Sequence, residues 1–440
     1  MSTARSTFWQ FTITLMLLTL VSLTSTTQAT NGYFRHGYGT QYRGMSGAGV
    51  ALYLNAMGVA TNPAMAAYLS SQFDLGFSLF NPNRQYTVGG APSGYPGTFP
   101  LMVGTVESDS KIFFIPNFGI NLKLPAATHA FNLAVFGNGG MNTDYANTAT
   151  FDYVNPAYTP PTGVDLSQLF VAATYALEVA PNQSLGVSGI FAWQRFRAEG
   201  INVFGDVGFS SDPANLSNND YATSTGLGVR LGYLGQLHSK LSVGASYQFK
   251  IDMSAFDEYA GLFAQQGDFD IPANWTVGFA IKPNDMFAAA FDLQKILYSD
   301  VRSVGNSLVL PMLPNGQPNP AFRQLGDAEG PGFGWDDMTI YKFGLQWTAN
   351  ESTVLRGGYS FTEQPIPSSE VLFNILAPGV IEQTVTLGLS RTLSQKLTLN
   401  VALMHGFSNT VSGPNPLDPF ETIDLEMNQW EGDISISWKL

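Results

Sequence analysis

The chain has 440 residues, of which only 12% are charged, with no Cys and a net charge of −13. The sparse charge argues against a soluble two-domain enzyme and against disorder. The acidic balance argues against nucleic acid as a partner, and the lack of Cys excludes a disulfide scaffold and thiol catalysis. The mean hydropathy of +0.04 is too low for a bundle of membrane helices. With 45 Gly and 13% aromatic residues, dispersed apolar residues favour β structure with two differently solvated faces.

Residues 1–29 are predicted to be a signal peptide. Arg5 supplies a positive start, residues 11–23 are mainly apolar, and Thr27-Gln28-Ala29 offers a small-residue cleavage site, so the mature chain would begin at Thr30. The alternative is a retained membrane anchor. A run of about 13 residues is too short to span roughly 30 Å of hydrocarbon, which favours the signal peptide.

Residues 30–70 show no alternation and are rich in Gly and Ala. Residues 55–60 and 64–69 are predicted to form two short helices. Pro63 suits the first position of the second helix, where its missing N–H costs little. Asn62 is the predicted N-cap.

From Gln72 onward the apolar residues recur with a period of two, which places them on one face of a sheet. The alternation is clearest in residues 73–79, 169–179, 227–233, 341–347, 397–403 and 434–440. Short polar links are expected at residues 125–128, 181–184, 236–239, 282–285, 349–352 and 392–395. Long Gly/Pro/Asn-rich links are expected at residues 89–101, 148–163, 208–220, 255–268, 300–335, 364–378 and 410–427.

This strict alternation of short and long links is typical of an outer-membrane β-barrel, with short periplasmic turns and longer external loops. Six short and seven long links join about fourteen antiparallel strands. The sheet must close, because lipid cannot satisfy the backbone groups of an open edge. Soluble β-sandwiches and propellers also alternate, but they lack this asymmetry and an aromatic girdle. The girdle candidates are Trp193, Tyr247, Trp275, Trp347, Trp430 and Trp438.

The sequence therefore predicts an all-β transmembrane barrel over residues 71–440, preceded by a partly helical plug, or hatch, over residues 30–70. The hatch is expected inside the lumen, where small residues permit close packing. A disordered periplasmic tail is the alternative, and the low charge of the segment argues against it.

Seven segments carry a shared set of motifs, at residues 31–34, 37–39, 44–51, 60–64, 271–278, 335–344 and 356–360. Together they resemble the FadL/TodX family of outer-membrane transporters for long-chain fatty acids and hydrocarbons. The resemblance implies that external loops capture a hydrophobic ligand, that a pocket against the hatch holds it, and that it leaves sideways through the barrel wall. Asn55 replaces a common acidic residue of the family, which puts a salt bridge holding the hatch in doubt. Leu440 replaces a terminal aromatic residue, which weakens the insertion signal.

The ligand-binding and gating candidates come from two sources. The resemblance places Tyr33 and Phe34 near the pocket and Asn62-Pro63-Ala64 in the hatch. By strand parity, cations face inward and could pair with a ligand carboxylate; they are Arg230, Lys342 and Arg356. The alternative is neutralisation by a lumen carboxylate such as Asp433 or by the hatch, and a neutral hydrocarbon would then be the better ligand.

Gly137, Gly139 and Gly140 interrupt the third strand and are predicted to kink it into a lateral exit, because Gly within a strand marks a bulge or bend. Ordinary barrel curvature is the alternative. The four His show no catalytic or metal-binding spacing, so no enzyme activity, cofactor or metal is expected. A barrel-embedded lipid hydrolase is the enzyme alternative. Outer-membrane lipids and lipopolysaccharide are the expected surroundings of a monomer, and a general porin or adhesive surface protein is the competing function.

Overall fold

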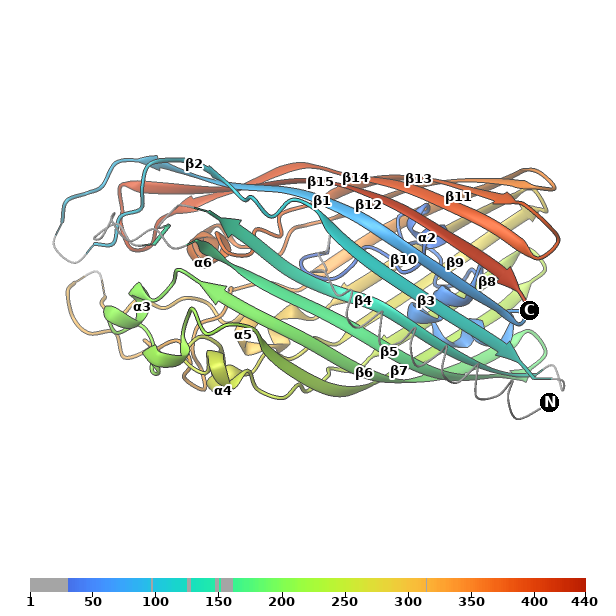
Figure 1. The fold of residues 1–440 in the computed structure, drawn as a ribbon, viewed down its shortest axis with the longest axis horizontal. Helices are drawn as coiled ribbons and strands as arrows, with labels where there is room; N and C mark the ends of the chain where they lie inside the picture. Colours follow the sequence, from blue (N-terminus) through green and yellow to red (C-terminus); the bar gives the residue numbers. More distant parts are fainter. Residues whose placement is uncertain (1–30, 96–97, 125–127, 147–149, 152–160, 314) are drawn as a thin grey trace, which may run out of the picture.

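The computed structural model describes residues 31–95, 98–124, 128–146, 150–151, 161–313 and 315–440. Fourteen of its fifteen strands form one closed antiparallel ring (Figure 1), because β15 pairs with β1 and β2 (Gly104–Glu107) pairs only with β1. The ring consists of β1 (Gln72–Gly90), β3 (Phe113–Lys123), β4 (His129–Tyr145), β5 (Thr162–Ala180), β6 (Gln183–Glu199), β7 (Ala222–His238), β8 (Leu241–Gln248), β9 (Asn274–Asn284), β10 (Phe287–Ile296), β11 (Met338–Asn350), β12 (Thr353–Thr362), β13 (Gln383–Thr392), β14 (Leu397–Pro414) and β15 (Glu421–Lys439).

Closure follows from the first and last strands. β1 and β15 pair over their whole length, from Gln72 opposite Lys439 to Gly90 opposite Glu421. A closed ring leaves no edge whose N–H and C=O groups would lie unpaired in lipid. The predicted closed barrel of about fourteen strands is confirmed.

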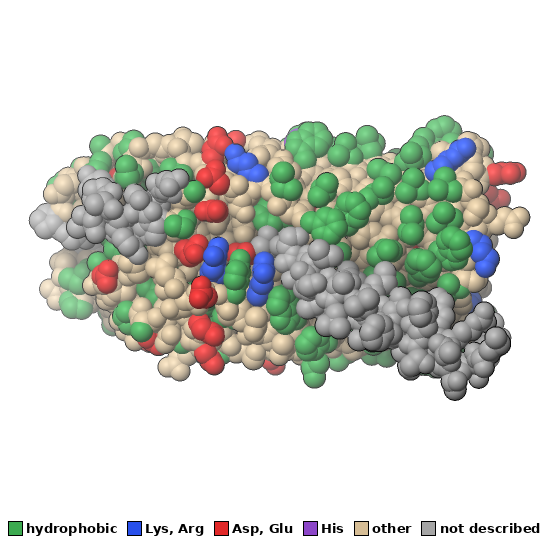
Figure 2. Space-filling model, viewed as in Figure 1, with side chains coloured by type: hydrophobic (Ala, Val, Ile, Leu, Met, Phe, Trp, Pro, Cys, Tyr) green, Lys and Arg blue, Asp and Glu red, His purple; other side chains and the backbone are tan. Residues whose placement is uncertain are grey.

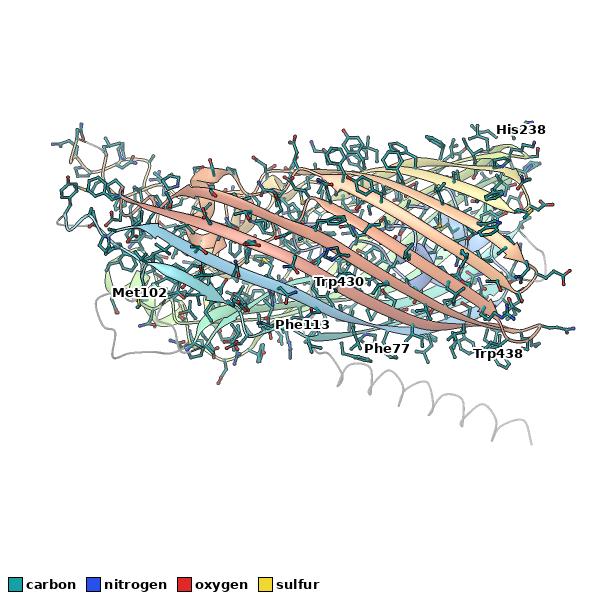
Figure 3. All side chains as sticks on the ribbon, turned by 90° about the horizontal axis from the view of Figure 1, so that it is seen from above. Phe77, Met102, Phe113, His238, Trp430 and Trp438 are labelled. Carbon is teal, nitrogen blue, oxygen red and sulfur yellow. The ribbon has the colours of Figure 1, made fainter. Side chains whose placement is uncertain are left out.

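The two faces of the wall differ as the alternation predicts. On β11 the side chains of Tyr341, Phe343 and Leu345 are exposed, whereas Lys342, between the first two, is buried. Figure 2 shows hydrophobic side chains spread over the half of the barrel that carries the short turns, and a belt of acidic and basic side chains between this half and the loops. Figure 3 marks Trp430 and Trp438 on the outer wall.

The predicted links match the structure with one exception. Residues 410–427 were expected to form a long loop, but β14 and β15 occupy most of this range and the connection is reduced to residues 415–420. The prediction was wrong because Gly413 and Pro414 were interpreted as loop signals, whereas both belong to the outer end of β14. Parts of the predicted links 89–101, 125–128, 148–163 and 300–335 lie outside the described residues.

The other long links form a cap with short helical turns. Its α-helices are α3 (Val203–Asp206), α4 (Ala264–Gly267), α5 (Arg302–Gly305) and α6 (Val371–Asn374), and its 3-10 helices are Pro213–Asn215, Asp257–Tyr259, Tyr298–Asp300 and Ser368–Glu370. Among the described residues, no helix is both long and apolar enough to span a membrane.

Residues 31–71, here called the lumenal segment, lie inside the ring near its short-turn end (Figure 1). They contain α2 (Thr40–Arg43) and two 3-10 helices, Ala56–Ala60 and Pro63–Ala67. Asn62 is the N-cap of the second 3-10 helix, as predicted, since its side chain accepts a hydrogen bond from Ala64 N at 3.1 Å. The predicted signal peptide lies outside the described residues.

Candidate functional site

Close backbone contacts hold the lumenal segment against the wall. Inward-facing glycines of three strands touch it so tightly that an added Cβ would lie 2.3–2.4 Å from its backbone: Gly186 meets Pro63, Gly244 meets Val50, and Gly358 meets Met45. Real Cβ atoms essentially never approach that closely. The glycines of these strands therefore make room for the segment, at β6, β8 and β12.

A buried ionic cluster joins the lumenal segment to β15. Arg35 contacts the Glu431 carboxylate at 2.5 Å, and Arg43 contacts both Glu431 and, at 3.2 Å, Asp433. Ser78 of β1 donates a hydrogen bond to Asp433 at 2.5 Å. These ion pairs and hydrogen bonds offset the cost of removing the four charges from water. Asp433 is among the predicted alternative partners of the barrel cations, whereas the roles of Arg35, Arg43 and Glu431 are not predicted by any local pattern.

Two further wall carboxylates accept backbone hydrogen bonds from the segment. Asp74 accepts from Ala56 N at 2.8 Å. Asp292 accepts from Gly49 N at 2.8 Å and from Val50 N at 2.9 Å. Together with the ionic cluster, these contacts fasten the segment on opposite sides of the lumen.

The three cations that strand parity predicts to face inward do face the lumen and are buried: Arg230, Lys342 and Arg356. Within the described chain, none of the three has a carboxylate oxygen within 4.0 Å. Lys342 Nζ donates to the carbonyl oxygen of His36 at 3.1 Å, and Arg230 donates to the side chain of Gln248. Arg356 donates to two neutral side chains at 2.9 and 2.6 Å. Of the alternative partners, Asp433 pairs with Arg43 of the lumenal segment and not with these cations, whereas Lys342 does bond to that segment through His36.

Arg230 and Lys342 share a small polar pocket beside the lumenal segment. About 20 Å³ of it can hold the centre of a water molecule, which is enough for a water or one small polar group. Asn274 Nδ2 and Gln294 Oε1 are buried there without a hydrogen-bond partner among the described residues. The pocket is lined by Arg35, Gly37, Tyr38, Gly47, Ala60, Thr61, Arg230, Asn274, Thr276, Gln294 and Lys342.

His36 lies against Lys342 and is neutral. Its Nε2 is 3.0 Å from Ser360 Oγ, and its Nδ1 has no partner among the described residues. Burial and the nearby Lys342 ammonium lower the pKa of His36 to about 3. The imidazole therefore adds no positive charge to the lumen at neutral pH.

Tyr33 and Phe34 pack under an external loop. Tyr298 Oη accepts hydrogen bonds from Tyr33 N at 3.2 Å and Phe34 N at 3.3 Å, and it donates to Asn31 O at 2.5 Å. The rings of Tyr33 and Tyr298 are 5.1 Å apart, and Trp335 lies 5.1 Å from Tyr298. Tyr33 and Phe34 line neither the polar pocket nor the loop cavity described below.

The Asn62-Pro63-Ala64 turn attaches the segment to β6 and β7. Asn62 Nδ2 donates to Val50 O at 2.8 Å and to Tyr233 O at 2.9 Å. Ser184 Oγ donates to Ala64 O at 3.0 Å. All three residues of the turn are buried, and their contacts are to protein backbone and side chains.

The predicted glycine kink coincides with a bulge in β4. The register between β4 and β5 shifts between Gly137 and Gly139. At this point the lumenal segment pairs with β4, since Arg35 N donates to Asn138 O at 3.0 Å and Gly140 N donates to Tyr33 O at 2.9 Å. The β3–β4 ladder ends just below, at Asn117 opposite Phe136.

β4 is buried on both faces from Ala134 to Thr143, a stretch that begins within the β3–β4 ladder and continues beyond its end. Further along, the β2–β3 connection hydrogen-bonds to β4, where Asp109 N donates to Asp144 O at 2.7 Å. The region between these two levels, where the β3–β4 ladder is interrupted, is called the wall window below. Phe113 (labelled in Figure 3) and Pro116 of β3 flank it, and Pro116 has no N–H for a ladder bond.

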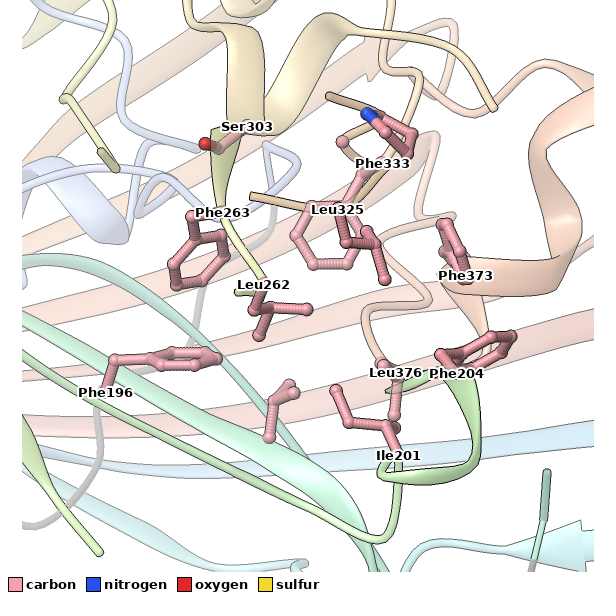
Figure 4. A pocket seen from close by; sticks show the side chains of 13 residues that line it. Phe196, Ile201, Phe204, Leu262, Phe263, Ser303, Leu325, Phe333, Phe373 and Leu376 are labelled. Atoms are coloured by element: carbon pink, nitrogen blue, oxygen red, sulfur yellow. The ribbon is translucent and has the colours of Figure 1, made fainter. Parts of the chain in front are cut away.

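An apolar cavity lies between the external loops (Figure 4). Only about 30 Å³ of it can hold the centre of a water molecule, so its side chains are tightly packed. The hydroxyl of Ser303 donates to Asp268 O. The cavity is lined by Val164, Phe196, Ile201, Phe204, Leu262, Phe263, Ser303, Leu325, Pro331, Gly332, Phe333, Phe373 and Leu376. These residues are not among the predicted ligand-binding candidates, although Phe residues in otherwise polar loops indicate a buried apolar site.

Comparisons with known proteins agree with this architecture. Residues 21–416 match the family model described as "Outer membrane protein transport protein (OMPP1/FadL/TodX)". The structure is similar to the toluene transporter TodX of Pseudomonas putida, with 18% identity, 93% of this chain and 100% of that chain covered, and a TM-score of 0.66.

It is also similar to a Pseudomonas aeruginosa FadL homologue, with 12% identity, coverage of 93% and 99%, and a TM-score of 0.67. A third similar structure is that of the Ralstonia pickettii toluene transporter TbuX, with 18% identity, coverage of 92% of this chain and 99% of that chain, and a TM-score of 0.60. At these identities the solved structures establish the shared fold. No curated protein matches the chain.

Proposed function

Because the chain belongs to the outer membrane protein transport family (OMPP1/FadL/TodX), we propose that it takes up hydrophobic small molecules passively across the bacterial outer membrane. The observation that carries this proposal is the apolar cavity of the external loops, where the ligand would first bind. Two similar structures are described as toluene transporters, which supports the same ligand class here. Transfer from water into such a site is favourable by about 0.8 kcal/mol per buried CH₂ group.

Capture requires the loop cavity to open, because only about 30 Å³ of it can hold even the centre of a water molecule. Phe204 packs at 5.3 Å from Phe373, and both rings would move aside for the ligand. Apolar side chains can exchange contacts with one another for contacts with the ligand at little cost, whereas a polar lining would have to lose hydrogen bonds. The aromatic lining thus suits a site that opens on binding.

The lumenal segment acts in this proposal as the hatch, and the wall window acts as the exit. A straight path to the periplasm is filled by the segment and its ionic cluster. The window offers a sideways path into the membrane that keeps an apolar ligand out of water. One chain contains the whole route, so the proposed transporter works as a monomer, surrounded by membrane lipids and lipopolysaccharide. No step requires a catalytic residue.

A ligand that carries a carboxylate is the candidate that the polar pocket favours. Arg230 and Lys342 have neutral hydrogen-bond partners and no carboxylate within 4.0 Å in the described chain. Asp292 lies opposite Lys342 on β10, but it accepts hydrogen bonds from Gly49 N and Val50 N, so a carboxylate headgroup would supply the first ionic contact within 4.0 Å. A long-chain fatty acid therefore fits this chain better than a neutral hydrocarbon such as toluene.

The test of the uptake function is Phe204→Asp, which places a charge in the loop cavity. Uptake of radiolabelled oleate and of toluene should both fall at least tenfold in cells that express the variant. Val207→Asp is the matched control, because Val207 follows α3 but is 51% exposed. Equal uptake by the two variants would contradict the proposal. Planar-bilayer recordings distinguish the proposed transporter from a general porin. A porin gives large steady currents, whereas a barrel whose lumen is filled by the lumenal segment gives almost none.

A further inference from the structure

A second apolar depression, here called the wall groove, lies on the outer surface of β10, β11 and β12, next to the short turns. About 490 Å³ of it can hold the centre of a water molecule, and its surface is almost entirely apolar. The wall groove is lined by Pro283, Phe287, Ala288, Ala289, Leu345, Gln346, Trp347, Leu355, Arg356 and Gly357. It has no part in the proposed transport route.

Two small residues create the wall groove. Ala289 and Gly357 lie opposite Leu345 on its two neighbouring strands. An added Cβ at Gly357 would meet only the carbonyl oxygen of Thr386, at 3.9 Å. Gly358, one residue further, faces inward and gives way to the lumenal segment. No part of the described chain fills the space beside Gly357, so this space is open to the membrane.

Large side chains close the wall groove towards the turns. Phe287 and Trp347 stack in parallel, with ring centroids 6.3 Å apart and an interplanar angle of 6°. Leu355 lies opposite Trp347 on the next strand. Aromatic rings at this depth are typical of the boundary between acyl chains and headgroups, and short turns mark the periplasmic side of a barrel. The groove therefore faces the periplasmic leaflet.

An exposed cation lies at the headgroup end. Arg391 of β13 is opposite Thr353 and donates a hydrogen bond to its hydroxyl, so the guanidinium leans towards β12. Gly357 is four residues from Thr353 along the strand, or about 14 Å. A lipid phosphate on Arg391 would thus place an acyl chain along the groove, and a guanidinium suits phosphate oxygens well. Glu351, in the turn before β12, is also exposed and carries the charge that an ammonium headgroup would attract.

We infer that the wall groove holds one glycerophospholipid of the periplasmic leaflet, with an acyl chain over Gly357 and the phosphate at Arg391. The occupant is a phospholipid and not lipopolysaccharide, because the groove is at the short-turn end. The shape, the apolar lining and the exposed Arg391 guanidinium all point to this chemistry.

The test is native mass spectrometry of the full-length protein released from nanodiscs of palmitoyl-oleoyl phosphatidylethanolamine. The wild type should retain one phospholipid, and Gly357→Phe, which fills the groove, should reduce the retained fraction at least tenfold. Gly189→Phe is the matched control, since Gly189 also faces lipid and has nothing within 4 Å of an added Cβ. Arg391→Gln should lower retention several-fold.

Ala289→Phe fills the same groove from β10 and serves if Gly357→Phe does not insert. No retained lipid in the wild type would overturn the inference, and so would equal retention in Gly189→Phe and both groove-filling variants. Uptake of oleate should be unchanged in the groove variants, which keeps this test separate from that of the transport proposal.

Discussion

Gly139→Val is expected to close the wall window. A Cβ at Gly139 would lie 2.0 Å from the carbonyl oxygen of Tyr33, so residues 33–35 must move away from β4. Two backbone hydrogen bonds are then lost, from Arg35 N to Asn138 O and from Gly140 N to Tyr33 O. Each contributes about 0.5–1.5 kcal/mol, so the kinked form of β4 loses about 1–3 kcal/mol. That corresponds to a shift of roughly 5- to 150-fold towards a straight strand paired with β3.

The assay is the initial rate of oleate uptake into proteoliposomes, which should fall at least fivefold. Gly432→Val is the control, because an added Cβ at Gly432 of β15 meets nothing within 4 Å. Heat-modifiable migration on gels verifies that both barrels are folded. Wild-type uptake by a folded Gly139→Val barrel would refute the assignment of the window as the exit.

Three other perturbations test the lumen. Arg43→Met removes the cation that contacts the buried Asp433. This change should lower the free energy of unfolding by about 3–5 kcal/mol and appear as new conductance in planar bilayers. Unchanged stability and no conductance would contradict the role of the ionic cluster. Replacing Arg230 and Lys342 together by Met should reduce oleate uptake about tenfold and leave toluene uptake unchanged, whereas an equal loss of both would point away from a carboxylate ligand. His36 has a folded pKa of about 3, below its unfolded value of about 6.5, so the unfolded chain binds more protons between these limits. The free energy of unfolding in urea should therefore fall as the pH drops from 6.5 to 3, by at most about 1.4 kcal/mol per pH unit, and His36→Gln should flatten this slope.

The strands and their links were predictable because they depend on local patterns. Alternation along β11 indicates which residues face lipid, and it identified Lys342 as inward-facing without any tertiary information. The N-cap at Asn62 was equally local, since the cap contacts a residue two positions away. The one wrong link, residues 410–427, lies where strands extend beyond the membrane and Gly and Pro no longer mark their ends.

The partners of the inward residues were not predictable. Parity identifies the face of Lys342, but its partner His36 is 306 residues away in sequence. Likewise, the candidates Tyr33 and Phe34 were expected at the pocket, yet Tyr298 of a distant loop binds their backbone. Such contacts depend on the register of every strand between the two residues, which no local pattern records.

A barrel with two different faces, an even number of strands and a small-residue segment ahead of it follows from local patterns, because lipid allows the backbone few other solutions. The contacts of Arg43 with Glu431 and Asp433, the end of the β3–β4 ladder at Asn117 and the apolar cavity enclosed by four loops follow from the fold alone. They depend on ring closure, since the pairing of β1 with β15 brings the first and last strands together and so sets which side chains share the lumen.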